Sequence, residues 1–181
     1  MNRTFDLTSN ITMPHPLQAQ CRIDTPLGPL TLVATARGLA AALFDAQKHH
    51  PGDLALPCEP QHPHLAQAAA EFAAYFDNST LVFRVPLDAQ GSDFQQAVWR
   101  VLLSIAPGRL STYGQIARQM GRADGARAVG SAVGRNPISI IVPCHRVVGH
   151  DGALTGYAAG LPRKQALLRH EGVLQTQGAL I

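Results

Sequence analysis

The sequence predicts an α+β fold, in which a small N-terminal antiparallel sheet with a helix precedes a mainly helical C-terminal domain that contains a helix-turn-helix. Short apolar segments separated by Pro- and Gly-containing turns fill residues 20–90, whereas helical apolar spacing and small residues mark residues 91–181. Residues 1–19 show neither pattern and are predicted to be an irregular extension. A chain of 181 residues is long enough for two such small domains to share one core.

The N-terminal domain is predicted element by element from its apolar segments and turns. Residues 21–35 indicate two strands joined by a Pro-Leu-Gly-Pro turn, and residues 38–45 indicate a third strand. Residues 48–64 are rich in Pro and His and indicate a loop, whereas residues 65–77 carry a helical pattern with three aromatic side chains. Residues 81–87 form a short extended piece. An antiparallel sheet with a helix packed on it is the natural assembly of these elements.

The C-terminal domain is predicted to begin with a capped helix. Ser92 is a hydroxyl N-cap and Gln95 follows three residues later, which is the spacing of a capping box. Pro107-Gly108 is expected to end this helix. The helix carries an apolar stripe at helical spacing, formed by Phe94, Val98, Trp99 and Leu102. This stripe predicts that Trp99 belongs to the core.

Two short helices over residues 113–120 and 126–134, joined by a Gly-containing turn at 121–125, indicate a helix-turn-helix. Many helical hairpins share this pattern, so the pattern alone leaves nucleic-acid binding open. The second helix is built from Ala, Gly, Ser and Val, with Arg127 near its start. Each glycine costs about 1 kcal/mol inside a helix. Either a tight helix–helix contact or close approach to a nucleic-acid groove would compensate for that cost.

Charge is distributed unevenly along the chain. Residues 1–90 carry five Lys/Arg and eight Asp/Glu, a net charge of −3, whereas residues 91–181 carry ten and four, a net charge of +6. A basic C-terminal half favours a polyanionic partner, although arginines on a solvated face are the commoner explanation. No apolar run approaches the roughly 20 residues needed to span a membrane, and no secretory leader is evident. We therefore expect a cytoplasmic protein with reduced cysteines and no membrane partner.

The residues around Cys144 predict a reactive thiol. The apolar run at residues 138–142 predicts a strand that delivers Cys144 into a buried place, and Pro143 bends the chain just before it. A thiol with a pKa of roughly 8.5 needs help to become a thiolate, and the adjacent His145 could accept its proton. Glu171 could orient His145 through the second ring nitrogen.

The segment Pro143-Cys144-His145-Arg146-Val147 resembles the active-site motif of the O6-alkylguanine-DNA alkyltransferases, also called methylated-DNA–protein-cysteine methyltransferases. The likeness follows family order across residues 92–172 and is only loose in residues 20–90. The other matching segments are Phe94-Gln-Gln-Ala-Val-Trp, Tyr113-Gly-Gln-Ile-Ala, Arg127-Ala-Val-Gly, Arg135-Asn-Pro, Gly156-Tyr157 and Leu167-Leu-Arg-His-Glu-Gly.

The resemblance implies direct-reversal DNA repair, in which an alkyl group moves irreversibly from the O6 of guanine to Cys144. O4-alkylthymine as a substrate stays open, as does the preferred alkyl size. The implied protein works once, because a thioether has no step that restores the thiol. It needs no cofactor, since the substrate carries the alkyl group. The implied partner is double-stranded DNA bound through the minor groove by a monomer, and clustering on DNA stays open.

The resemblance also implies roles for single residues. Cys144 is the acceptor, His145 acts as its base through a water, and Glu171 completes the relay. Tyr113 hydrogen-bonds the flipped guanine, and Asn136 ties the recognition helix to the active-site loop. Arg127 enters the duplex in place of the flipped base. The other implied DNA-binding residues are Ala126, Ala128, Gly130, Ser131 and Arg135. The implied pocket residues are Tyr157, Ala158, Ser139 and Val147.

Departures from the family pattern leave alternatives open. Ala158-Ala159 replaces a Ser or Gly pair, and Ser139 replaces a pocket-lining Pro of some relatives. Some relatives bind a structural zinc, but the local cluster Cys58-x3-His62-x-His64 misses paired-ligand spacing, so no metal is predicted. A lesion sensor of the alkyltransferase-like type would lack the acceptor cysteine that this chain keeps. A cysteine hydrolase unrelated to DNA would turn over many times, so stoichiometry separates it from a single-use acceptor.

Overall fold

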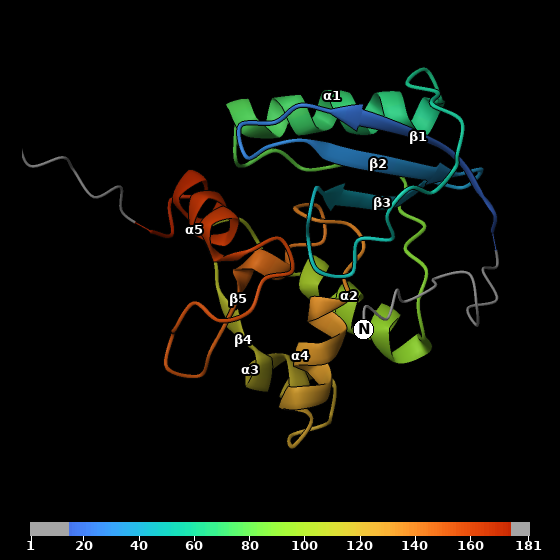
Figure 1. Cartoon of the computed structure of the whole chain (residues 1–181). Helices are drawn as coiled ribbons and strands as arrows, with labels where there is room; N and C mark the ends of the chain where they lie inside the picture. Colours follow the sequence, from blue (N-terminus) through green and yellow to red (C-terminus); the bar gives the residue numbers. More distant parts are fainter. Residues whose placement is uncertain (1–14, 175–181) are drawn as a thin grey trace, which may run out of the picture.

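The computed structural model describes residues 15–174, and its N-terminal half is a three-stranded antiparallel sheet with one helix (Figure 1). The sheet has the order β1-β2-β3, with β1 at Leu17–Ile23, β2 at Leu30–Thr35 and β3 at Leu39–Phe44. The helix α1, Pro63–Asp77, packs on this sheet through Leu65, Ala68, Phe72 and Tyr75. The fold class that the sequence predicts is confirmed.

β1 begins earlier than expected. The sequence predicts an irregular extension over residues 1–19, but β1 starts at Leu17, which pairs with Thr35 of β2. The alternation that buries Ala19 and Cys21 extends back to the half-buried Leu17, and this strand pattern is too short on its own to be recognised. The first 14 residues of the predicted extension lie outside the described part of the chain.

The C-terminal half contains the four other helices that the structure describes. α2 spans Asp93–Leu103 and has the predicted capping box between Ser92 and Gln95. It ends at Leu103, before Pro107-Gly108. The two predicted short helices are α3, Tyr113–Gln119, and α4, Ala126–Gly134, and α5 spans Leu161–His170. Two short strands that the sequence did not reveal, β4 at Ser111–Thr112 and β5 at Val147–Val148, pair in parallel.

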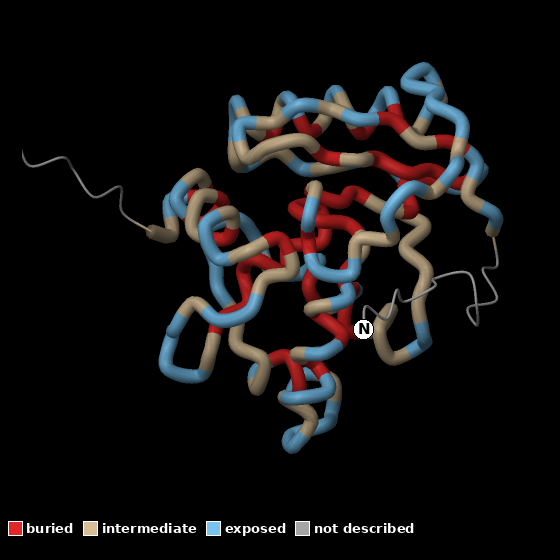
Figure 2. The backbone as a smooth tube through the Cα atoms, in the orientation of Figure 1, coloured by how far each residue is buried: buried red, intermediate tan, exposed pale blue. Residues whose placement is uncertain are grey.

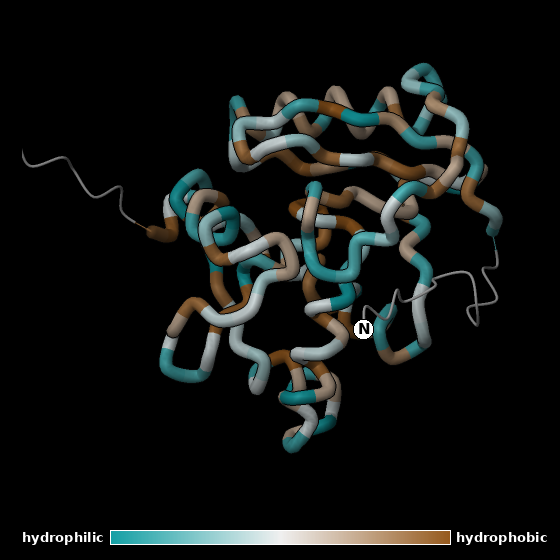
Figure 3. Tube along the Cα trace, in the orientation of Figure 1, coloured by the Kyte–Doolittle hydropathy of each residue, from teal (hydrophilic) through white to brown (hydrophobic). Residues whose placement is uncertain are grey.

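The apolar run before Cys144 is not the predicted strand. Residues 139–141 form turns, residue 142 is a bend, and Ile140 has a φ of 71°. The run is apolar because it is buried between the two halves, where Ala42 of β3 accepts a bond from Ser139 (2.9 Å) and donates one to Pro137 (2.9 Å). Edge strand β3 is covered in this way. Figure 2 shows buried chain both in the sheet and in the segment beneath it, and Figure 3 shows apolar residues in both of these parts.

No helix within residues 15–174 is long and apolar enough to cross a membrane.

Candidate active site

Cys144 begins a single 3-10 turn, η1 (Cys144–Arg146), and is 5% exposed. The side-chain amide of Asn136, just after α4, lies 3.1 Å from the Cys144 Sγ and also donates to the Val142 carbonyl at 2.8 Å. Asn136 Oδ1 accepts the Ile138 N–H at 3.0 Å. One buried amide therefore joins the end of α4 to the turn that carries the sulfur.

His145, Glu171 and Arg146 form a buried charge network. His145 Nε2 and Glu171 Oε1 lie 2.9 Å apart, and Arg146 donates Nε to Oε2 (2.9 Å) and Nη2 to Oε1 (2.8 Å) of the same carboxylate. Arg146 also bonds to the Ile105 carbonyl. Tyr75, on α1 in the N-terminal half, donates its hydroxyl to Glu171 Oε1 at 2.8 Å. His145 Nδ1 is buried and bonds to no described protein atom.

The pKa shifts in this network follow from burial and from these bonds. Burial alone would raise the pKa of Glu171, but hydrogen bonds and charges from His145 and Arg146 outweigh it and lower that pKa to about 2. Burial lowers the pKa of His145, against the opposing pull of Glu171. Burial raises the pKa of Cys144, and the Asn136 hydrogen bond opposes this rise. The Glu171 carboxylate is therefore ionised, the His145 imidazole is neutral and the Cys144 thiol is protonated.

Lys164 is a functional candidate that the sequence motifs did not single out. This fully buried residue of α5 donates its Nζ to the carbonyls of Val147, Thr155 (2.7 Å) and Gly156 (3.3 Å). Burial lowers its pKa to about 8, and its charge favours a thiolate at Cys144. The signal was present in the sequence, because Lys164 shares the helical spacing of the buried Leu167 and Leu168.

A cavity of about 550 Å³ lies against Cys144 and is walled by both halves. The predicted pocket residues Tyr157 and Ala158 line it, together with Tyr113. Its remaining lining comes from α4 with the adjoining Arg135, from Gly156, and from the loop after β3: Gly130, Ser131, Val133, Gly134, Lys48 and His49. Burial and the nearby Cys144 raise the pKa of Tyr157.

Two predicted pocket residues do not line this cavity. Ser139 is buried and its hydroxyl lies 3.4 Å from Gln47 Oε1, while its backbone N–H bonds to β3. Val147 is fully buried in β5. Both are buried in the core instead. A Pro at position 139 would also lose the N–H that binds Ala42, because proline has no backbone donor.

One face of α4 is exposed to solvent. Arg127, Ala128 and Ser131 are exposed, as is Arg135 just after the helix, whereas Ala126 and Gly130 are half-buried. The opposite face packs on α2, where Trp99 donates its indole N–H to the Ala132 carbonyl at 2.9 Å. Trp99 belongs to the core, as predicted.

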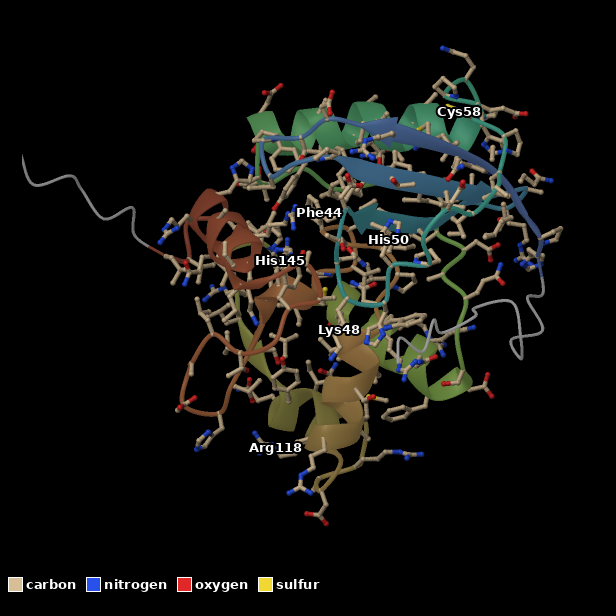
Figure 4. All side chains as sticks on the ribbon, viewed as in Figure 1. Phe44, Lys48, His50, Cys58, Arg118 and His145 are labelled. Carbon is tan, nitrogen blue, oxygen red and sulfur yellow. The ribbon has the colours of Figure 1, made fainter. Side chains whose placement is uncertain are left out.

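The three cysteines occupy different environments. In Figure 4, Cys58 lies beside the start of α1, far from Arg118 on α3, whereas His145 and Lys48 lie between the sheet and α4. Cys21 is buried in β1 and Cys58 is exposed. Among the described residues, no group of three His, Cys, Asp or Glu side chains converges to hold a metal ion.

The site combines a buried cysteine that faces a pocket with an adjacent histidine–glutamate pair, and the pocket lies beside a helix-turn-helix. This combination defines the class of protein. Two family models match the chain: "6-O-methylguanine DNA methyltransferase, DNA binding domain" at residues 93–173, and "6-O-methylguanine DNA methyltransferase, ribonuclease-like domain" at residues 22–89. The chain belongs to the 6-O-methylguanine DNA methyltransferase family.

Individual relatives agree with this assignment. The methylated-DNA–protein-cysteine methyltransferase of Mycobacterium bovis is 46% identical over 149 residues, which cover 82% of this chain and 89% of the relative. The Salmonella typhimurium relative of the same name is 41% identical over 162 residues, covering 84% and 95%. A crystal structure of Mycobacterium tuberculosis OGT in complex with DNA superposes with a TM-score of 0.77 at 44% identity, covering 84% of this chain and 92% of that one.

Proposed function

We propose that this protein repairs DNA by transferring an alkyl group from the O6 of guanine to its own Cys144, once per molecule. The observation that carries the proposal is the position of Cys144 against a two-walled pocket, bonded to Asn136 and followed by the buried His145–Glu171 pair. Family membership supplies the substrate class, because the relatives are named as methylated-DNA–protein-cysteine methyltransferases.

The reaction would proceed by displacement at the alkyl carbon. His145, neutral in the resting protein, takes the thiol proton through one water, and the low pKa of Glu171 keeps a negative charge ready to stabilise the imidazolium. The Asn136 amide and the Lys164 charge stabilise the thiolate. The sulfur forms a bond to carbon as the carbon–O6 bond breaks, and guanine leaves with the electron pair. The guanine anion then takes a proton from the hydroxyl of Tyr113, which lines the pocket, and the proton held by His145 returns through water to the Tyr113 oxygen, so that no net charge is left behind.

The guanine must leave the duplex to reach a sulfur that is 5% exposed. α4 is suited to the DNA side of this step because its glycines are not required by internal packing. A Cβ at Gly130 would meet only the Tyr113 ring at 3.7 Å, and one at Gly134 would meet no atom within 4 Å. Close approach to a DNA groove therefore explains these glycines better than a helix–helix contact does. We infer minor-groove binding by a monomer, with Arg127 filling the gap of the flipped base.

Mass spectrometry of the intact protein after reaction with O6-methylguanine DNA tests the proposal. We expect one added methyl group per chain, located on Cys144 by peptide mapping, with no further turnover when DNA is in excess. Cys144→Ser should abolish uptake while DNA binding persists, because phosphate and groove contacts lie elsewhere. Cys58→Ser, which changes an exposed thiol away from the pocket, is the matched control. Label on Cys21 or Cys58, or multiple turnovers, would overturn the proposal.

A further inference from the structure

The loop after β3 is a wall of the pocket that the family motifs do not include. Lys48 and His49 line the cavity that holds Cys144, together with Gly130, Ser131 and Gly134 of the α4 helix. Both residues come from the N-terminal half, which carries net negative charge by sequence. Among the described residues that line this cavity none is acidic, and Arg135, just after α4, lines it as well and lies near enough to His49 to influence its charge.

The loop is held in place by bonds to both halves. The Lys48 backbone N–H donates to the Ala158 carbonyl of the pocket at 2.8 Å. Gln47 is buried, and its Oε1 accepts the Phe44 N–H at 2.9 Å and lies 3.4 Å from the Ser139 hydroxyl. The His50 N–H closes the turn on the Gln47 carbonyl at 3.1 Å. Lys48 is therefore presented from a fixed backbone, which lowers the entropy lost when it binds a ligand.

Lys48, His49 and Arg135 act on one another electrostatically. Burial and then the positive charges of Arg135 and Lys48 lower the pKa of His49, so the imidazole is neutral at pH 7 and offers an N–H. His49 also holds a φ of 67°, a conformation that is uncommon for a residue with a side chain. Lys48 and Arg135 are exposed, and no ion pair to an acidic group is found for either of them within residues 15–174.

We propose that Lys48, together with Arg135 and His49, binds a backbone phosphate of the extruded nucleotide at the mouth of the pocket. The inference rests on the proposed function, since a base that enters this cavity brings its own phosphates to the rim. Two cations and a neutral N–H suit a singly charged phosphodiester. The N-terminal half then binds DNA directly.

The test is the salt dependence of DNA binding, measured by fluorescence anisotropy with full-length protein. All variants carry Cys144→Ser so that no transfer occurs, and the probe is a duplex with one O6-methylguanine. Lys48→Met should weaken binding about three- to tenfold at about 0.1 M NaCl and reduce the slope of log K against log salt by roughly one, as expected for one lost phosphate contact. Lys48→Arg should retain most of the affinity.

Arg84→Met is the matched control. It removes another exposed cation from the N-terminal half. Arg84 lies beside α1, where its backbone N–H, which the substitution keeps, donates to Glu71. An unchanged slope in Lys48→Met, an equal loss in Arg84→Met, or an equal loss in Lys48→Arg would overturn the phosphate site. Lys48→Met could also weaken binding to an undamaged duplex as much as binding to the O6-methylguanine duplex. That result would overturn the proposal, because the site would then not belong to the extruded nucleotide. Methyl uptake by the wild-type chain is measured separately, so failure of the proposed function is distinguishable.

Discussion

The two halves of the molecule contribute to the site in different ways. The C-terminal half supplies the reacting group and its immediate partners, Cys144, His145 and Glu171, within one stretch of chain. The N-terminal half supplies single contacts from separate elements: Tyr75 of α1 binds Glu171, and Lys48 lines the cavity. A short motif thus marks the half in which chemistry is concentrated, whereas support from the other half is spread over long sequence separations and leaves no local motif.

The largest effect is expected inside the C-terminal half, for Glu171→Gln. The change leaves the buried Arg146 without its counter-ion, which should destabilise the fold by about 3–5 kcal/mol. Because the folded pKa of Glu171 is about 2, against an ordinary 4.5, its contribution is present above about pH 4.5 and is lost as the pH falls toward about 2. Urea unfolding of wild type and variant at several pH values should show their difference shrinking across this window. A constant difference would show that the charge network is not its source.

Arg127→Ala should slow the reaction with duplex DNA and leave the stability of the fold nearly unchanged. This exposed residue near the start of α4 is the candidate that fills the gap of a flipped base, whose extrusion costs a few kcal/mol. We expect the ratio of the second-order rate constants for duplex DNA and for free O6-benzylguanine to fall about tenfold or more. Arg127→Lys should recover part of the ratio, since it restores charge but not a planar group. Equal slowing of both substrates would assign Arg127 a structural role instead.

Tyr75→Phe measures how much the N-terminal half contributes to the charge network around Glu171. It removes one charge-assisted hydrogen bond to Glu171 across 96 positions of sequence and keeps the aromatic ring, so the stability loss should be about 1.5–3 kcal/mol. The lost donor should also raise the pKa of Glu171, which moves the acid limb of the stability profile to higher pH. Tyr113→Phe, which removes a longer 3.4 Å bond to Thr155, is the comparison variant. If Tyr75→Phe leaves the acid limb unmoved, α1 merely packs beside the relay.

Ser139→Ala should have the smallest effect, below about 1 kcal/mol, because the hydroxyl that it removes makes a long 3.4 Å contact with Gln47. Ser139→Pro should cost more, since the 2.9 Å backbone bond to Ala42 is lost as well. Thermal unfolding of the two variants measures the difference. Equal stabilities would mean that the backbone bridge between the halves contributes little, and would weaken the view that the N-terminal half supports the pocket.

The sequence predicts those parts of the structure that depend on local signals. The capping box at Ser92 and the core position of Trp99 were predictable because neighbouring residues specify them. The run before Cys144 was wrongly predicted as a strand, because apolar composition reports burial and does not distinguish a strand from buried turns. Tyr75 and Gln47 could not be assigned, since their partners lie in the other half and their residue types are common.

The contact between Tyr75 and Glu171 has a consequence for how the chain folds. Loop-closure entropy must be overcome before contacts so distant in sequence form, and such contacts slow folding. A chain made from its N-terminus completes the sheet first, then Cys144, and 27 residues later the carboxylate that receives both His145 and Tyr75. Until Glu171 is in place, Cys144 lacks the aligned His145–Glu171 pair, and Tyr75 joins that pair only when the halves dock. For a thiol proposed to react only once, this order means that its full set of partners forms only after the N-terminal half, which lines the pocket, has been made.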